Sequence, residues 1–419
     1  MPDPQQSHPE LRDIPVARST AILILRVVGD ISPPREPWAV GPYPWLLPRK
    51  DNQYLYRDRA DEQTRNEYFE PRVRPLLYGH IRWHRDVPTE CRLDEWTVTA
   101  AELLKYPADY GPEGALFIVH LQFDAPDVEA MAANVARLAN MRPTATSEVS
   151  NLDSVRTLAG DLLSGVEVAF QRTAYVISHM TTSTGLDDAG RIQGLSDTPA
   201  PYGVSRLLAS ANEVRALPAE LQTREPGVQD IGLSTSWVAT VLRAGCAFVG
   251  RTSEVEDGYH DLAEVLVHTL YLDSLLVGLI QRDCIEERTN RLVSAWEPNS
   301  RIKDIARQER QIINLRGQAW WLEIAQAENP NRLLSALQIQ FRLPDQLDRL
   351  NRDVMDLARI TDAARQERTN RLLNILVIAS AALGLAALIA DPGRTAVLWG
   401  LGLAIATWLI ISLAGRDRP

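Results

Sequence analysis

Two long, charge-free runs of hydrophobic residues lie next to each other near the end of this 419-residue chain. The first run spans Leu372–Ala390 and the second spans Thr395–Ala414. Each has about the 20 residues that a helix needs to cross the hydrocarbon core of a bilayer. Only Asp391–Arg394 separates the runs, and Pro392 and Gly393 within it break a helix and turn the chain. The pattern predicts a hairpin of two antiparallel transmembrane helices.

Basic residues on either side of the predicted hairpin indicate its orientation. Arg365, Arg368 and Arg371 precede the first run, and Arg416 and Arg418 follow the second. Because positively charged residues stay on the cytoplasmic side of a membrane, both flanks should lie in the cytoplasm. We therefore expect a multi-pass membrane protein with cytoplasmic N- and C-termini, whose hairpin tip faces outward.

A heptad pattern of mostly apolar residues leads into the first run. Its members are Leu343, Leu347, Leu350, Val354, Leu357, Thr361 and Ala364. Alternating spacings of four and three residues are typical of a helix that packs on another helix. Pro344 suits a first helical turn, and no helix breaker follows it before Pro392. We therefore predict one continuous helix over Asp345–Ala390, about 46 residues and roughly 70 Å long at 1.5 Å per residue.

Two further stretches favour helices. Asp261–Val293 is strongly apolar but is interrupted by polar residues, so we expect a buried bundle helix and not a third span. Its most apolar part, EVLVHTLYLDSLLVGLI, is interrupted by Glu264, His268 and Asp273. We interpret His268 as a structural histidine in preference to a metal ligand. The second stretch, Ile302–Ala327, contains Trp320 and Trp321, and we expect Pro330 to end it.

The first half of the chain carries a pattern typical of strands. Apolar runs at Ala21–Val28, Ala115–Phe123 and Val166–Ile177 predict three strands, with Tyr78–Trp83 as a fourth. Asp127–Asn140 between them is an amphipathic helix candidate, so we expect an α/β or α+β layer. The predicted division of the chain is residues 1–230 as a cytosolic α/β domain, 231–371 as a long-helix bundle and stalk, 372–414 as the transmembrane hairpin and 415–419 as a cytosolic tail.

An insertion at residues 31–94 of that domain combines prolines and aromatic residues with arginines. Aromatic faces and guanidinium groups suit a nucleotide-like ligand, which needs stacking and phosphate contacts. The candidate ligand-binding residues are Trp45, Arg57, Arg72, Arg74 and Arg82. Two other interpretations remain open, namely an irregular insertion whose aromatic residues pack on the body and a contact between subunits.

Composition and motifs exclude several classes of function. A net charge of −10 and a pI near 5.3 argue against direct binding of long nucleic acids, which normally needs a basic face. The three cysteines have no paired spacing, so neither a disulfide framework nor a zinc site is indicated. His80 and His84 lie near Glu90 and Cys91, but we expect no metal there. Since no phosphate-binding loop, nucleophile elbow or zinc-protease motif occurs, we expect neither an enzyme nor a bound cofactor.

The order of elements resembles the CorA family of magnesium channels. That family has a cytosolic α/β body, long helices of which one continues into the first span, a short outer loop and a basic tail. The resemblance covers Asp261–Pro419, and similarity at the residue level is limited to the junction ERTNRLLNIL, Glu367–Leu376. The Gly-Met-Asn signature of the family is replaced here by Ala390–Arg394. The residues with which the family selects its ion therefore have no counterpart in this chain.

The resemblance implies a homo-oligomer, pentameric as in the family, in a bacterial inner membrane. CorA-like proteins without the signature occur as membrane effectors of antiviral defence, including type III CRISPR systems, and are thought to sense a nucleotide signal. This implies an ion channel that responds to a small nucleotide-type ligand through a cytosolic sensor domain. A divalent-cation transporter of the magnesium type is one alternative, and a non-conducting, membrane-anchored binding or scaffold protein is another.

A pore needs several copies of this chain, because two helices cannot enclose a water path. One face of the first span is polar at its cytosolic end and small in the middle, which suits a pore lining with Leu388 as a hydrophobic constriction. This face comprises Asn370, Asn374, Val377, Ala381, Gly384 and Leu388. A competing face would place arginines at the pore mouth and comprises Arg368, Arg371, Ile375, Ile378, Ala382 and Leu385. We favour the first face.

Overall fold

The computed structural model describes residues 9–29, 31, 38–48, 54–55, 62–88, 90–107, 111–140, 169–170, 174–193, 195, 198–211, 229–253, 258–295, 310–317 and 320–389. The chain divides into two compact units. The sheet unit combines Met1–Glu287 with Asn314–Leu347, and the helical unit combines Arg288–Ile313 with Asp348–Pro419. Each unit is described by itself below.

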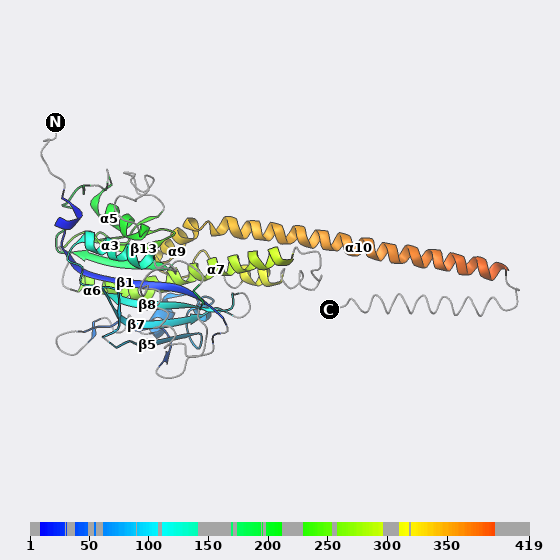
Figure 1. Cartoon of the computed structure of the whole chain (residues 1–419), viewed down its shortest axis with the longest axis horizontal. Coiled ribbons are helices and arrows are strands. Elements are labelled where there is room, and N and C mark those ends of the chain that lie inside the picture. Colours follow the sequence, from blue (N-terminus) through cyan, green and yellow to red (C-terminus); the bar gives the residue numbers. More distant parts are fainter. Residues whose placement is uncertain are drawn as a thin grey trace, which may run out of the picture. The chain divides into compact units, whose positions relative to one another are not determined.

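Eleven described strands form one sheet in the sheet unit (Figure 1). They are β1 (Val16–Val28), β2 (Ala39–Val40), β5 (Arg82–Asp86), β6 (Arg92–Leu93), β7 (Trp96–Lys105), β8 (Ala115–Gln122), β9 (Ala169–Phe170), β10 (Tyr175–Thr182), β11 (Asp230–Gly232), β12 (Trp237–Val241) and β13 (Gly245–Gly250). Their order is β11-β12-β13-β10-β1-β8-β7-β5-β2, with β6 paired to β7 and β9 to β1. Strands β3 (Leu47–Pro48) and β4 (Tyr54–Leu55) form a separate hairpin.

The sheet is mixed, because one of its described pairs is parallel. Strands β10 and β13 run in the same direction, and the other described pairs are antiparallel. A parallel pair needs a long crossover connection, and helix α5 (Ala200–Ser210) lies in the one between these strands. The sheet continues to Gly250, past residue 230, where we placed the end of the α/β domain.

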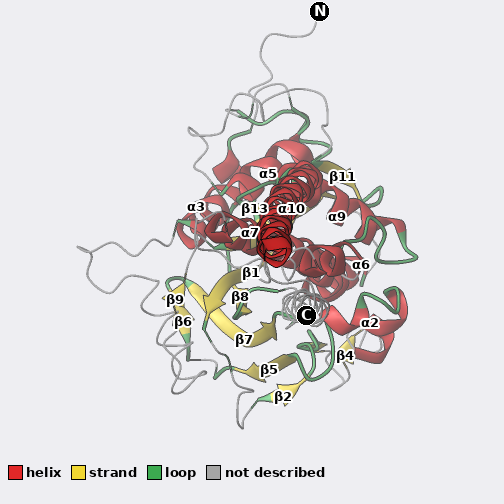
Figure 2. Ribbon diagram, turned by 90° about the vertical axis from the view of Figure 1, so that its right-hand side faces the viewer, coloured by secondary structure: helices red, strands yellow, loops and turns green. Residues whose placement is uncertain are grey.

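Helices cover both faces of the sheet (Figure 2). The other helical elements are η1 (Leu11–Asp13), α2 (Glu62–Tyr68), η2 (Arg74–Leu76), α3 (Val128–Ala139), α6 (Tyr259–Leu266), the π-helical η5 (Val267–Tyr271), α7 (Leu272–Ala295), α9 (Glu328–Gln340) and α10 (Leu343–Ile389). In β1, Leu23 and Leu25 face a core shared with α3 and α5, whereas Ile22 and Ile24 face a core shared with α7 and α9. This alternation follows from the two-residue period of a strand and makes the sheet the middle of three layers.

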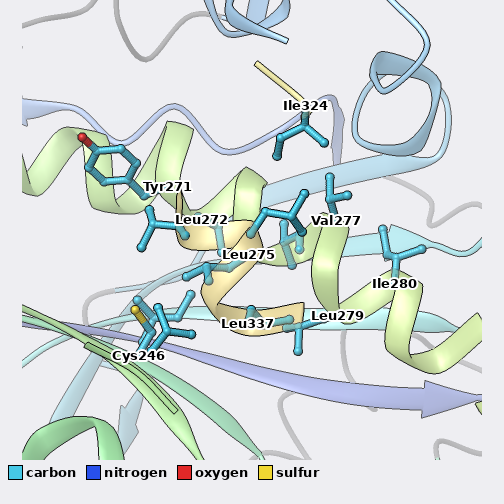
Figure 3. Close-up of a cluster of buried hydrophobic side chains, with 14 of the residues drawn as sticks. Cys246, Tyr271, Leu272, Leu275, Val277, Leu279, Ile280, Ile324 and Leu337 are labelled. Atoms are coloured by element: carbon cyan, nitrogen blue, oxygen red, sulfur yellow. The ribbon is translucent and has the colours of Figure 1, made fainter. Parts of the chain in front are cut away.

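The elements α6, η5 and α7 form one long apolar helix in the core. Its span Tyr259–Val293 is long and apolar enough to cross a membrane, but 94% of its most apolar window is buried inside the protein. Figure 3 shows its side chains Tyr271, Leu275 and Ile280 in a cluster with Leu337 of α9. The prediction of a buried helix over Asp261–Val293 is therefore confirmed, but most of this helix covers a face of the sheet and not the interior of a helix bundle.

Helix α10 is a single helix of 47 residues, which confirms the predicted continuous helix up to Ile389. Leu343 and Leu347 belong to a core of the sheet unit. The heptad residues Leu350, Val354 and Leu357 pack with Leu292 and Ile312 in a core of the helical unit. The side chains of Thr361 and Ala364 lie outside the described residues, as does the second predicted span, Thr395–Ala414.

The predicted helix Ile302–Ala327 is wrong over its last part. Residues 310–317 are helical, but residues 320–327 are not, and Ala325 instead forms a β-bridge with Phe69. Pro330 does not end a helix and lies in the first turn of α9. A proline is tolerated there because the first amides of a helix have no partner in the helix itself.

The strand predictions are correct for β1 and β8 and shifted for two others. Strand β5 begins at Arg82 and not at Tyr78, because Gly79 turns the chain with a φ of 83°. Strand β10 begins at Tyr175, whereas the prediction began at Val166. The strands that were not predicted are β2, β3, β4, β6, β7, β11, β12 and β13. The predicted helix Asp127–Asn140 is confirmed as α3, with the Asp127 carboxylate accepting a bond from the Ala130 amide.

Close packing of α7 on α9 predicts that a larger residue at Gly278 must displace the leucines of α9. A Cβ atom at Gly278 would lie 2.5 Å from Cδ2 of Leu337 and 3.2 Å from Cδ1 of Leu334. We expect Gly278→Val to lower the free energy of unfolding by about 2 kcal/mol through overpacking, measured by denaturant unfolding. The control is Gly317→Val, since a Cβ atom at Gly317 would have no neighbour within 4 Å. Equal effects of the two substitutions would contradict the packing described here.

Candidate functional site

A group of polar side chains lies on the face of the sheet that packs against α7 and α9, the same face as Ile22 and Ile24. Thr20 of β1, Glu102 of β7 and His120 of β8 are buried on this face. They share it because residues two apart in a strand point to the same side. Polar groups buried in this way need partners, and the covering elements α2, η5 and α7 supply them.

The carboxylate of Asp273, at the start of α7, is the centre of this network. Arg65 of α2 donates to both of its oxygens, from Nε at 2.9 Å and from Nη2 at 2.7 Å. Arg82 of β5 donates from Nη1 at 2.6 Å, and the Tyr78 hydroxyl donates at 2.7 Å. Arg82 also donates from Nε to Glu102 at 2.6 Å. Two arginines therefore share two carboxylates, and the buried charges balance.

The balance of charge keeps these groups ionised despite their burial. Burial opposes the charge on Arg82, but Glu102 and Asp273 outweigh it and hold the pKa of Arg82 above its ordinary value. Burial likewise works against the charged form of Glu102, yet Arg82 and the hydrogen bond from His120 hold its pKa well below the usual range. Burial, reinforced by the charge of Asp273, raises the pKa of Tyr78, so this hydroxyl stays a donor.

A chain of hydrogen bonds runs from Glu102 through two histidines to Thr20. His120 Nε2 lies 2.7 Å from Glu102 Oε1, and its Nδ1 lies 2.9 Å from Nδ1 of His268. His268 Nε2 lies 2.9 Å from Thr20 Oγ1. Since the Glu102 carboxylate only accepts, His120 carries its proton on Nε2 and accepts at Nδ1. Burial lowers the pKa of both histidines and so favours their neutral forms. In the neutral pair, His268 donates from Nδ1 and accepts the Thr20 hydroxyl at Nε2, which defines both tautomers.

The π-helical segment η5 explains why His268 and Asp273 serve the same network. Residues five apart lie about 140° round from each other on an α-helix, so these two side chains would point in different directions. A π-helix bonds residues five apart and so brings them nearer to one face. The π-helical segment therefore lets His268 and Asp273 point toward the sheet together. π-Helical turns of this kind occur frequently at functional sites.

Trp45 covers the histidine pair from the segment that follows β2. Its ring stacks on His268, with centroids 3.6 Å apart and planes inclined by 9°, and it also lies 5.7 Å from His120. The indole Nε1–H donates to Glu264 Oε1 at 3.1 Å. Burial raises the pKa of Glu264. Tyr43, two residues earlier, lies 5.2 Å from His120, and its carbonyl accepts from Arg65 at 3.0 Å.

The predicted ligand-binding residues are not brought together as one set. Trp45 and Arg82 are buried in the network described above. Arg74 is partly buried and donates to the Phe69 carbonyl at 3.0 Å, while Arg72 is exposed. Arg57 lies outside the described residues. Binding of a nucleotide-like ligand by these residues stays a prediction.

The predicted pore-lining residues lie on α10. Asn370, Asn374, Val377 and Ala381 are exposed, whereas the side chains of Gly384 and Leu388 lie outside the described residues. Their role in a pore stays a prediction. In the part of the chain that the structure describes, no three histidine, cysteine, aspartate or glutamate side chains are placed to hold a metal ion. His84 Nδ1 lies 2.9 Å from the Gly41 carbonyl oxygen, with which it can form a hydrogen bond.

Most of the network escaped prediction from sequence. The sequence singled out His268, which is buried and hydrogen-bonded, but its partners His120 and Thr20 were not identified. One signal was available, because Glu264, His268 and Asp273 interrupt a helix that is otherwise apolar, and a buried polar group needs a partner. No local pattern marks those partners.

Comparisons with known proteins add little to this description. No protein-family model and no curated protein matches the chain. Among solved structures, that of the full-length CmaX protein is similar to 60% of this chain and 91% of its own length, with 12% identity and a TM-score of 0.22. A TM-score this low does not define a shared fold.

The first prediction from the network concerns its central carboxylate. Asp273→Asn leaves Arg65 and Arg82 short of one negative charge, and we expect a loss of about 3–5 kcal/mol in the free energy of unfolding. The control is Asp356→Asn, which breaks an exposed ion pair with Arg359 at 3.5 Å and should cost less than about 1 kcal/mol. Denaturant unfolding measures both. A loss at Asp273 no larger than in the control would contradict the network.

The second prediction concerns His179 of β10, whose ring nitrogens are both buried without a partner. Burial lowers its pKa to about 3, whereas an unfolded histidine titrates near pH 6.5. Between these values the unfolded chain binds one proton more than the folded chain, so stability falls as the pH falls. We expect His179→Phe to reduce the pH dependence of the unfolding free energy by about 1.4 kcal/mol per pH unit between pH 6.5 and 4.5.

The control for this measurement is His80→Phe, since His80 is exposed. Its unfolding free energy should keep the pH dependence of the wild-type protein. If His179→Phe also kept that dependence, the neutral buried state of His179 would be disproved.

Proposed function

We propose that this chain is a homo-oligomeric, CorA-like membrane protein whose C-terminal hairpin forms a pore controlled by the sheet unit. The observation that carries this proposal is the apolar part of α10. From Leu372 to Ala382 the side chains are exposed, apart from the half-buried Leu376, and the exposed fractions reach 63% for Ile375 and 68% for Ile378. Consecutive exposed positions cover every direction around a helix. Water is a poor surrounding for such a surface, and a bilayer or neighbouring copies would bury it.

The length of α10 supports the same proposal. The first predicted span, Leu372–Ala390, is helical as far as Ile389, so it continues the stalk without a break. The second predicted span, Thr395–Ala414, is one residue longer than the first and also carries no charge. With four residues between the spans and arginines outside both, the hairpin would keep both termini in the cytoplasm.

Two features support control of the hairpin by the rest of the chain. Leu343 and Leu347, in the first turns of α10, are part of a core of the sheet unit, and the same helix continues into the apolar segment. A helix transmits a displacement along its axis because its backbone bonds lie within the element. The sheet unit would therefore act as the sensor, with a small nucleotide-type signal as the ligand class that the resemblance to CorA suggests.

The experiment is a pair of cysteine substitutions at neighbouring positions of α10. The full-length protein is reconstituted in planar bilayers and treated with a membrane-impermeant thiol reagent. We expect Val377→Cys to lose most of its current, since Val377 belongs to the proposed pore face. Ile378→Cys should keep its current, since Ile378 belongs to the competing face. Both residues are comparably exposed, at 61% and 68%.

The control is the wild-type protein with the same reagent, because Cys246 and Cys284 are buried and Cys91 is partly buried. Block of Ile378→Cys alone would assign the lining to the competing face. Absence of current with any ion, in the presence of cyclic or linear oligonucleotides, would disprove the pore and favour a membrane-anchored scaffold. Current carried by Mg²⁺ and not by monovalent ions would favour the divalent-cation transporter.

A further inference from the structure

The segment Tyr43–Leu47, called the strap below, lies over the histidine pair. Trp45 stacks on His268 and donates to Glu264. Around Trp45, the partly buried side chains of Tyr43, Leu46 and Leu47 form a small cluster with Val265 that is separate from the two cores of the sheet unit. Arg65 also donates to the Tyr43 carbonyl at 3.0 Å, and the Tyr43 ring lies 5.8 Å from that of His84. The two contacts of Trp45 are those whose partners, His268 and Glu264, change charge in acid.

We propose that the His120–His268 pair is an acid-operated latch that holds the strap closed at neutral pH and releases it when both rings take up protons. The geometry of the pair limits it to one shared proton. With Nδ1 atoms 2.9 Å apart, one nitrogen must donate and the other must accept. A first extra proton can enter at Nε2 of His268, because the Thr20 hydroxyl can turn from donor to acceptor. A second proton would place two N–H groups against each other and break the contact.

The charged groups near the pair determine how readily His120 and His268 take up a proton. The titratable and charged groups around it are Glu102 of β7, Arg82 of β5, Arg65 of α2, Asp273 of α7, Glu264 and Asp261 of α6, His179 of β10 and Arg18 of β1. Glu102 and Asp273 are already paired with the two arginines, so they leave little negative charge for an imidazolium. Burial lowers the pKa of both His120 and His268, and for His268 its neighbours His120 and His179 add to this.

Opening of the strap would remove the cost of burying a charged histidine ring. Trp45 is 3% exposed and covers both rings, so its departure would bring water to them. The open form would then bind protons near pH 6.5, and the closed form would bind them only at lower pH. By linkage, the opening constant rises about tenfold per pH unit for each histidine that is freed. When both rings are freed, we therefore expect the opening constant of the strap to rise about a hundredfold for each pH unit by which the pH falls below about 6.5.

Hydrogen exchange of the full-length protein measures this opening. Exchange is followed by mass spectrometry in peptides that cover the strap between pH 7.5 and 4.5, with rates corrected for intrinsic exchange. His268→Gln is the first variant, since its amide can donate to His120 and accept from Thr20 but cannot take up a proton. We expect its opening to change by about one decade per pH unit and not two, because one titrating ring remains.

Further variants separate the latch from its neighbours. His120→Gln should give the same reduced slope, so the test does not depend on the folding of one variant. Glu264→Gln keeps an acceptor for the Trp45 indole but cannot titrate, so a slope at least as steep as that of the wild-type protein assigns the pH dependence to the histidines and not to Glu264. His80→Gln, at an exposed position, should also leave the slope unchanged. The proposal is overturned if strap exchange in the wild-type protein is independent of pH, or if the two buried-histidine variants keep its slope.

Discussion

The sheet unit depends on one buried carboxylate, that of Asp273. It ties α7 to α2 through Arg65 and to strand β5 through Arg82, and all three side chains are excluded from water. Buried charges of this kind are stable only when every one is paired, since desolvation costs each ion several kcal/mol. The arginines suit the site because a guanidinium keeps its charge and can donate in several directions at once. Moving α7 along the sheet by one residue would leave Asp273 and Arg65 without their ionic partner, and Arg82 with Glu102 alone.

The apolar contacts around this network are less selective. Leu275, Leu279 and Leu337 stabilise the packing of α7 on the sheet and on α9, but hydrophobic burial is proportional to area and tolerates small shifts. The polar network has fixed directions and distances, so it selects one register from those that the apolar surfaces would allow. The π-helical segment η5 is consistent with this, because it departs from regular α-helical hydrogen bonding where His268 contacts His120.

Helix α10 passes through three environments, and its composition follows them. Leu343 and Leu347 are buried in the sheet unit, Leu350 to Leu357 pack in the helical unit, and Leu372 to Ala382 are exposed. A helix can bridge such different surroundings because its backbone bonds are satisfied internally wherever it lies. This continuity joins a buried end in the sheet unit and an exposed apolar segment within one element.

Local patterns in the sequence determined the long elements of this protein. Heptad spacing and the lack of helix breakers were enough to predict α10, and an apolar run with three polar interruptions was enough to predict a buried helix at Asp261–Val293. Local patterns gave a wrong helix end at Pro330, because a proline is compatible both with the end of one helix and with the first turn of the next. The network was decided by the tertiary structure alone. Thr20 and His268 lie 248 residues apart, and Arg82 and Asp273 lie 191 apart, so only the folded sheet brings them within hydrogen-bond distance.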